Sequence, residues 1–331
     1  MAFSNVSDDS VLSPSPEIES NFSNPPSQET LIIGMGTALV ALMVLAVTIR
    51  IWVRIRILKI WGADDTTILP AACGAISFIV IYTQGFQYGL GRHVWDVPKS
   101  MLSPRLTLLV SLCSNETPIR QTINEREVLI ANTTYPFTAC FTKLSILLLY
   151  RRLFPVHRER YAIWTGIWLF TILYSVLTIL SAIRAAKCDN NIPWTNPQPY
   201  CTFAATTLAK WTSVLNVLSD FYVLLLPIPA IVALKLSVRR KVGVLVVFAS
   251  GLCVCAASLA RLIHLFIDSE NHDFFWNEAT IALSGMNEIN IGIIVACANT
   301  FPAFIGCVRS WGCSMAEPFR TRRARQLFLY L

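Results

Sequence analysis

Charged side chains stand deep inside several long apolar runs of this sequence, among them Lys143 and Asp220. A charge in hydrocarbon costs about 3 kcal/mol on insertion scales, so each one is expected to have a partner of opposite sign. Counted at 1.5 Å per residue, both side chains lie roughly 10 Å from the cytoplasmic ends of their predicted helices. Asn216 stands one turn above Asp220 on the same face. We predict a buried ion pair completed by Asn216; in the alternative interpretation, Lys143 extends to the inner interface.

Arg261 and Glu288 form the second predicted pair. They stand on consecutive antiparallel helices, each about 20 residues from the cytoplasmic end, which places them roughly 30 Å from the inner face. Asn287 and Asn290 flank Glu288, and His264 is one turn from Arg261. The structural interpretation is an ion pair that tethers two helices. The functional interpretation makes this cluster the floor of an outward-facing ligand pocket, with the pair as a switch that a polar ligand breaks.

The composition is that of a membrane protein. Of 331 residues, 54% are hydrophobic and 14% are charged, with a mean hydropathy of +0.54, whereas about a quarter of a soluble domain is charged. Seven apolar runs are long enough to cross roughly 30 Å of hydrocarbon as helices. They cover residues 31–49, 66–88, 129–150, 161–183, 204–228, 242–264 and 280–308. We predict an all-α polytopic membrane protein with a seven-helix bundle of GPCR-like topology over 31–309, a disordered tail at 1–30 and a basic tail at 310–331.

The distribution of lysine and arginine gives the predicted orientation. Of the 27 basic residues, 17 fall after the first, third and fifth runs and in the C-terminal tail. The positive-inside rule therefore predicts the N-terminus outside and the C-terminus in the cytoplasm. Glycosylation sequons begin at Asn5, Asn21, Asn115 and Asn132, and a glycosylated outer tail is expected. Short basic clusters between apolar runs indicate topology and anionic lipid binding, and they do not indicate nucleic acid binding.

Two motifs stand at predicted helix ends. The sequence Trp61-Gly-Ala-Asp64-Asp65 opens the second helix, where Asp side chains accept hydrogen bonds from unpaired backbone N–H groups. Capping is the favoured interpretation, and a binding site for a cytoplasmic partner is the secondary one. The sequence Tyr88-Gly-Leu-Gly-Arg-His93 closes the same helix, and its glycines suit a left-handed C-cap. A solvated helix end is the favoured interpretation for Arg92 and His93.

Five motifs together resemble one family. They are WGADD at 61–65, YGLGRHVWDVP at 88–98, KLSILLLYRRLF at 143–154, LSDFYVLLLPIP at 218–229 and RRKVGVLVVFASGLCVCAASLARL at 239–262. From about Arg50 to Arg309 the chain resembles the fungal rhodopsin-like integral membrane proteins, which include Pth-type receptors and satratoxin-cluster-type members. The resemblance implies a seven-helix, GPCR-like protein. It also implies a role in sensing surfaces or a place beside secondary-metabolite genes.

The sequence departs from that family in three places. Residues 1–30 contain no cysteine and so no cysteine-rich extracellular domain. The family's Cys-x-Pro after the fourth helix is replaced by Cys188-Asp-Asn-Asn-Ile-Pro193. Residues 113–127 are polar and are interpreted as an insertion before the third helix, with a gene-model error such as a retained intron as the alternative. The outer side is oxidising, so we predict a disulfide between Cys188 and Cys201, which share a loop. A bridge from Cys113 to the third helix is the alternative.

A receptor-like sensor, with a link to a secondary-metabolite gene cluster, is the function that these features favour. Its expected partners are membrane lipid, an unknown small molecule or surface cue, and a cytoplasmic signalling protein; the plasma membrane is its expected location. Residues 280–308 contain no lysine for a retinal Schiff base, so no cofactor is expected. The sequence Asn299-Thr-Phe-Pro302 is only distantly similar to the Asn-Pro-x-x-Tyr that ends helix seven of animal receptors.

Two other functional classes remain as alternatives. In an intramembrane enzyme such as a terpenoid cyclase, Asp220 or Glu288 would protonate the substrate. A basic residue at matching depth keeps each acid ionised, which argues against this chemistry. In a small-molecule transporter an internal repeat and paired broken helices are expected, and the sequence has neither. No metal-ligand spacing or nucleophile motif occurs along the chain.

Overall fold

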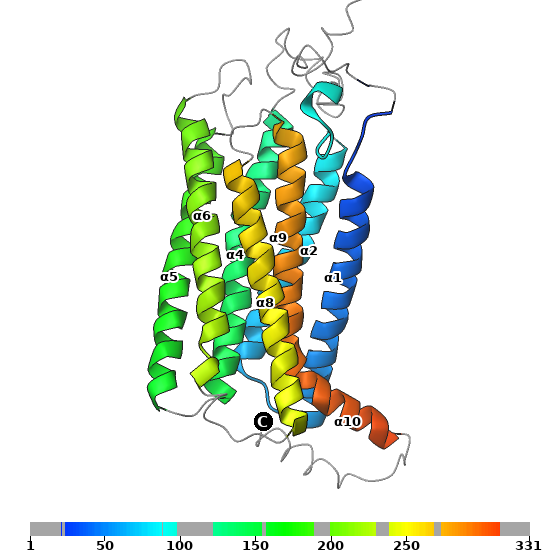
Figure 1. The fold of residues 1–331 in the computed structure, drawn as a ribbon, viewed down its shortest axis with the longest axis vertical. Coiled ribbons are helices and arrows are strands. Elements are labelled where there is room, and N and C mark those ends of the chain that lie inside the picture. The colour runs from blue at the N-terminus through cyan, green and yellow to red at the C-terminus, as the bar shows by residue number, and fades with distance from the viewer. Residues whose placement is uncertain are drawn as a thin grey trace, which may run out of the picture.

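A computed structural model describes residues 21, 24–87, 89–97, 122–153, 157–188, 199–229, 238–267 and 273–311. Over these ranges the chain forms seven long helices that run side by side (Figure 1). They are α1 (Glu29–Trp52), α2 (Ala63–Phe86), α4 (Thr122–Leu153), α5 (His157–Cys188), α6 (Pro199–Leu225), α8 (Val238–Ile267) and α9 (Phe274–Cys297). Shorter helices are η2 (Val53–Leu58), η3 (Val94–Asp96), η7 (Ala298–Thr300) and α10 (Phe301–Trp311). The predicted all-α seven-helix bundle is confirmed.

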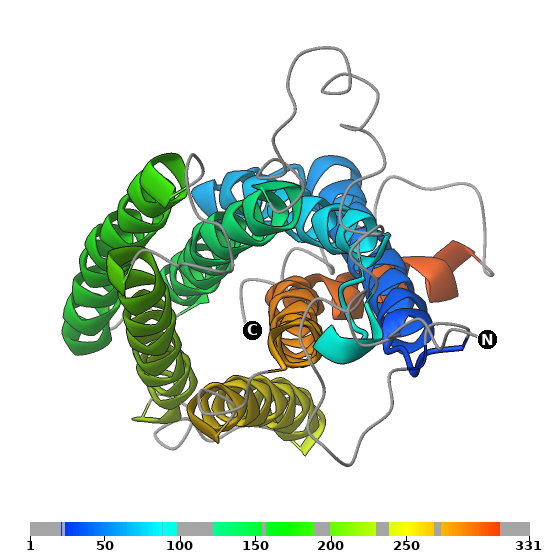
Figure 2. The same cartoon turned by 90° about the horizontal axis from the view of Figure 1, so that it is seen from above.

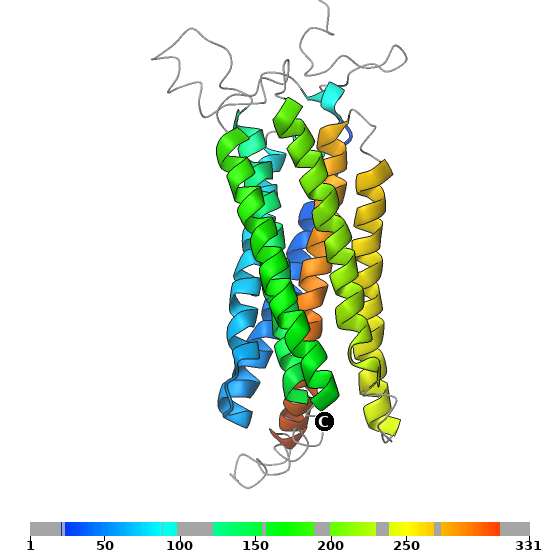
Figure 3. The same cartoon turned by 90° about the vertical axis from the view of Figure 1, so that its left-hand side faces the viewer.

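The seven long helices close into a ring. Each one packs against its neighbours in the order α1, α2, α4, α5, α6, α8, α9 and back to α1, and α4 also touches α6 and α9 across the interior (Figure 2). Seen from the side, the helices are close to parallel with one another (Figure 3). Side chains that point inward from α4, α6, α8 and α9 therefore meet in the same space.

Four stretches are long and apolar enough to cross a membrane: Glu29–Leu58, Ala63–Phe86, Arg160–Arg184 and Phe275–Val308. A shorter apolar stretch, Gly251–Phe266, lies within α8. In the described part of the chain, α4, α6 and α8 fall outside that set of four.

The seventh predicted run, 280–308, is not one helix, and this corrects the prediction. Helix α9 ends at Cys297, the 3₁₀ turn η7 follows, and α10 leaves the bundle beside α1 (Figure 1). The Thr300 hydroxyl donates to the Cys297 carbonyl oxygen at 2.7 Å within this turn. Pro302 then occupies the first turn of α10, where a missing backbone N–H is tolerated. The apolar run continues through the bend, so hydropathy alone does not reveal it.

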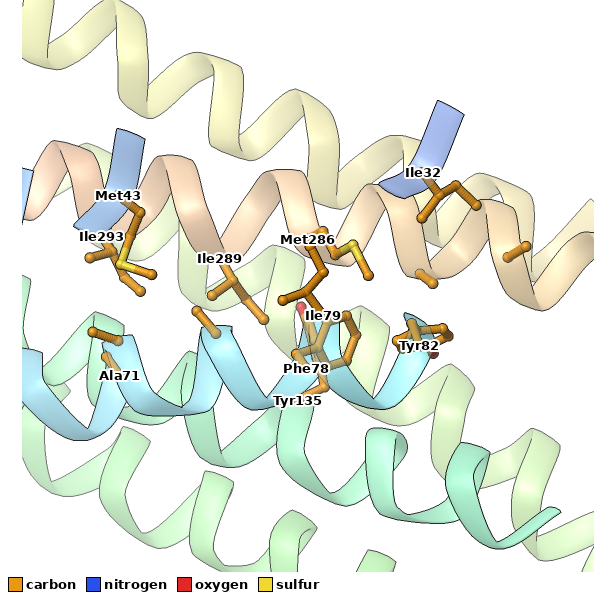
Figure 4. Close-up of a cluster of buried hydrophobic side chains, with 14 of the residues drawn as sticks. Ile32, Met43, Ala71, Phe78, Ile79, Tyr82, Tyr135, Met286, Ile289 and Ile293 are labelled. Atoms are coloured by element: carbon orange, nitrogen blue, oxygen red, sulfur yellow. The ribbon is translucent and has the colours of Figure 1, made fainter. Parts of the chain in front are cut away.

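Two apolar clusters hold the ring together. The larger one fills the space between α1, α2 and α9, with Tyr135 added from α4 (Figure 4). The smaller one joins α4, α5 and α6 around Leu147, Ile163 and Tyr174. The interface between the two clusters is where polar side chains accumulate.

Helix α4 begins at Thr122, so part of the predicted insertion is helical, and residues 113–121 lie outside the described residues.

Candidate functional site: a buried polar network

Lys143 of α4 and Asp220 of α6 lie in direct contact. Lys143 Nζ is 2.6 Å from Asp220 Oδ1, and both side chains are buried. Lys143 also donates to the Asn216 backbone oxygen and to Asn216 Oδ1, both at 3.0 Å, and to the Ser219 hydroxyl. Asn216, Ser219 and Asp220 share one face of α6 because residues three and four apart are neighbours on a helix. Lys143 therefore does not extend to the membrane interface.

Tyr174 of α5 joins this group, and the sequence analysis did not identify it. Its hydroxyl donates to Asn216 Oδ1 at 3.0 Å and lies 2.8 Å from the Ser219 hydroxyl. Lys143 Nζ is also 5.4 Å from the centre of its ring, within cation–π range. A tyrosine in an apolar run is compatible with ordinary core packing, so the sequence gives no signal that distinguishes this one.

Asn216 connects the two predicted charge pairs. Its side-chain oxygen accepts from Lys143 and Tyr174, and its amide donates to Asp220 Oδ2 at 3.1 Å and to Glu288 Oε1 at 2.8 Å. The side chain is fully buried, and its amide hydrogens and carbonyl oxygen each have partners. The predicted separation of the pairs into layers roughly 10 Å and 30 Å deep is therefore wrong. Because α9 ends at Cys297, Glu288 lies only about nine residues, or roughly 14 Å, from the end of its helix.

Arg261 of α8 and Glu288 of α9 are brought together, but less closely. Arg261 Nε is 3.7 Å from Glu288 Oε2, which is an electrostatic contact beyond hydrogen-bond distance. Arg261 Nε, Arg261 Nη2 and Glu288 Oε2 are buried without a hydrogen-bond partner. The other Glu288 oxygen accepts from the Tyr135 hydroxyl at 2.7 Å, and the Arg261 guanidinium lies 4.0 Å from the centre of the Tyr135 ring. This half of the network is charged, buried and incompletely bonded.

The remaining predicted members of the cluster are placed differently. Asn290 is buried, and its amide donates to the Met286 carbonyl oxygen at 2.8 Å, while its own Oδ1 has no partner. Asn287 Oδ1 is likewise buried without a partner. His264 lies on α8 with an exposed side chain.

Other predicted sites fall outside what the structure describes or lie apart from the network. The side chains of Cys188 and Cys201, and the residues Cys113, Asn5 and Asn115, are not among those described. Asn21 is exposed, and Asn132 is half-buried within α4. The described residues contain no group of three or more His, Cys, Asp or Glu side chains that could hold a metal ion.

A second buried cluster of charges lies at the basic end of the bundle, where α1 and η2 meet α2. Arg50 contacts Asp64 at 2.8 Å and Asp65 at 2.9 Å, and Arg54 contacts the same two carboxylates at 3.1 and 3.2 Å. All four side chains are at most 4% exposed. Arg152 of α4 stands 3.6 Å from Asp64. We call Arg50, Arg54, Asp64, Asp65 and Arg152 the inner cluster.

The inner cluster extends the predicted role of the WGADD motif. Asp65 Oδ2 accepts from the Gly62 backbone N–H at 3.1 Å, which is the expected capping contact. The aspartates also neutralise Arg50 and Arg54, which the sequence analysis had assigned to membrane topology alone. Arg50 in addition donates to the Ala296 carbonyl oxygen near the end of α9. The sequence did contain a signal for this cluster: two arginines four residues apart precede two adjacent aspartates at the start of the next helix.

The outer end of α2 is packed, in contrast to the solvated end that was expected. Gly89 and Gly91 both adopt positive φ, at 93° and 80°, as a left-handed turn requires. His93 stacks between Trp95 and Trp276, with ring centres 4.8 and 4.1 Å away, and its Nδ1 contacts Asp273. The loop 89–97 is thereby fixed to the start of α9.

Comparison with known proteins identifies the family. The sequence model of the family described as "Fungal rhodopsin domain" matches residues 49–306. A SAT4 family membrane protein of Emericella nidulans is 28% identical over 80% of this chain and 63% of its own length, and fugralins biosynthesis cluster protein 2 of Gibberella zeae is 22% identical over 90% and 71%. The receptor GIN3 of Arthrobotrys oligospora is 25% identical over 53% of this chain and 42% of its own.

The chain thus spans less than two thirds of the length of the SAT4 family relative. No solved structure matches this chain. The matched residues include the end of α1 and the six long helices that follow it, and both buried clusters lie within them. This protein is a helical membrane protein that belongs to the fungal rhodopsin domain family.

Proposed function

We propose that this protein is a receptor-like sensor of the plasma membrane whose switch is the buried polar network. The observation that carries the proposal is the connection of five helices through one set of contacts. Side chains from α4, α5, α6, α8 and α9 meet around Asn216 and Glu288. A receptor needs an element that can rest in two arrangements and that many helices share.

The two halves of the network differ in a way that suits such a switch. The Lys143–Asp220 half is tight, with a 2.6 Å ion contact and further hydrogen bonds from neighbouring groups. The Arg261–Glu288 half is open by comparison, at 3.7 Å and with donors and an acceptor unused. An incompletely bonded buried charge is costly, so a small shift of α8 that completes the pair changes the energy substantially. A polar cue that reaches this half would bias the same equilibrium.

The inner cluster supplies a route from the switch to the basic end of the bundle. Helix α4 carries Lys143 in the network and Ser145, whose hydroxyl donates to the Asp64 backbone oxygen at 2.9 Å. Helix α9 carries Glu288 in the network and Ala296, whose carbonyl accepts from Arg50. A displacement of either helix therefore acts on both charge clusters. A cytoplasmic signalling protein would read that displacement at the basic end.

The orientation follows the positive-inside rule, with the N-terminus outside. The inner cluster and α10 then face the cytoplasm, and the loop around His93 faces outward. Protease added to intact cells should remove an N-terminal epitope tag while a C-terminal tag survives. The opposite pattern would reverse the orientation and with it the placement of the signalling partner.

The relatives support this role and a connection to secondary metabolism. One is named a receptor and another a biosynthesis cluster protein. The alternative, an intramembrane acid catalyst, is not favoured by the contacts. Asp220 accepts from Lys143 and Asn216, and Glu288 accepts from Tyr135 and Asn216, so both carboxylates are held as acceptors and not as proton donors.

Deletion of the gene in its fungal host tests the proposal. We expect altered responses to surfaces or small molecules, together with a coordinated change in the amount of a complete metabolite family. Growth on different surfaces and metabolite profiling by mass spectrometry measure these effects. Accumulation of a single precursor with loss of the next product would contradict the sensor and identify an enzyme.

A further inference from the structure

The segment between α1 and α2 has a backbone that the buried clusters do not account for. After α1 the chain continues as the π-helix η2, and Lys59 then adopts a left-handed conformation with φ of 52°. A non-glycine residue in this region costs about 1–2 kcal/mol. The backbone N–H of Ile60 closes the turn by donating to the Arg54 carbonyl oxygen at 3.2 Å. Along this segment Arg50, Arg54 and Leu58 are buried, whereas other side chains are exposed: Ile55, Arg56, Lys59, Ile60 and Trp61.

These outward side chains combine apolar and basic character. Ile55, Ile60 and Trp61 are 52%, 40% and 47% exposed. Arg56 and Lys59, between them in sequence, are exposed as well. The nearby acids cannot neutralise this surface, because Asp64 and Asp65 are buried and paired with Arg50 and Arg54.

Helix α10 continues the same surface. It contacts η2, and the Phe304 ring meets Trp52 edge-on at 5.9 Å between centres. On its other side Ile305 and Val308 are 49% and 52% exposed. Figure 1 shows α10 leaving the end of the bundle at a steep angle to the long helices. We define the collar as the exposed residues Ile55, Arg56, Lys59, Ile60, Trp61, Ile305 and Val308.

We propose that the collar is a binding site for anionic phospholipid headgroups in the leaflet at the basic end of the bundle. A helix that lies across the end of a membrane bundle with exposed apolar side chains fits the headgroup boundary. Tryptophan prefers the same depth. Arg56 and Lys59 stand where phosphate and serine headgroups lie, and each basic residue near an anionic leaflet adds attraction.

The full-length protein, purified in detergent and incubated with an equimolar mixture of phosphatidylcholine and phosphatidylserine, tests the site. Native mass spectrometry counts the two lipids that stay bound. We expect phosphatidylserine to be enriched by roughly three-fold or more. The double variant Arg56→Gln/Lys59→Asn should bring this enrichment close to one. Asparagine is chosen because it tolerates the left-handed conformation of position 59.

Arg239→Gln/Arg240→Gln is the matched control. It removes the same charge from the start of α8, at the same end of the bundle, and should leave the enrichment unchanged. Equal losses in both variants would reduce the effect to overall charge and overturn the collar. Absence of enrichment in the wild-type protein would overturn it as well. Both substituted residues of the collar are exposed, so an unchanged unfolding temperature is the expected check on folding. The proposal does not depend on the receptor role, because lipid selectivity is measured without any signalling response.

Discussion

Lys143→Ala is expected to lower the free energy of unfolding by about 3–5 kcal/mol, because it leaves Asp220 buried without its cation. Asp220→Ala should have an effect of similar size, since Lys143 then keeps only neutral partners, Asn216 and Ser219. The double variant should recover part of this loss, because removing both charges also removes their desolvation penalty. Thermal unfolding of the purified proteins in one detergent, arranged as a double-mutant cycle, measures the coupling.

Tyr174→Phe is the control for that cycle. It removes a neutral hydroxyl from the same network and should cost only about 1 kcal/mol. Additive losses for Lys143→Ala and Asp220→Ala would show that the 2.6 Å contact contributes no coupling energy, contrary to the structure.

Arg50→Ala is expected to be the second most damaging single change, at about 3–5 kcal/mol. Arg50 is fully buried and is in contact with two carboxylates and the Ala296 carbonyl oxygen. Its removal leaves Asp64 and Asp65 with Arg54 as their nearest cation and frees the end of α9. Yield of folded protein on size-exclusion chromatography and unfolding temperature both measure the effect.

Arg56→Ala provides the comparison for Arg50, because Arg56 is exposed on the same segment. Its change should stay within about 0.5 kcal/mol, as for other surface substitutions. A similar, small effect at both arginines would mean that the inner cluster does not hold α1, α2 and α9 together.

The sequence allowed the charge pairs to be predicted because buried charges in an apolar run have few alternatives to pairing. Lys143 with Asp220 and Arg261 with Glu288 could be matched by counting residues from helix ends. The same counting failed for their relative depth, because the seventh run hides the bend at Ala298–Thr300. One misplaced helix end moved Glu288 by several turns and concealed its contact with Asn216.

Other features of the site lacked a distinguishing signal in the sequence. Tyr135 and Tyr174 are bonded through their hydroxyls to charged or amide groups, yet each stands in an apolar run where a core tyrosine is equally suitable. Arg50 and Arg54 were counted with the basic residues that set topology. Only the folded arrangement of η2 against α2 shows that they are buried and paired.

His93 shows the same limit at the outer end. A histidine after two glycines indicates a helix end, and helix ends in loops are usually solvated. Its packing depends on Trp276 and Asp273, which are about 180 residues away in sequence. Contacts of this range follow from the packing of α9 against α1 and α2, which closes the ring, and not from any local pattern.

The most direct test of the switch is Glu288→Gln in a strain that lacks the wild-type gene. Glutamine keeps the size of the side chain and can still accept from Tyr135 and Asn216, but it removes the charge that faces Arg261. A fluorescent tag measures the amount of protein that reaches the membrane, and the deletion phenotype measures the response. We expect Glu288→Gln to reach the membrane at wild-type levels and fail to restore the response. Full restoration would contradict the switch, and so would failure to fold, which would make the pair a structural tether.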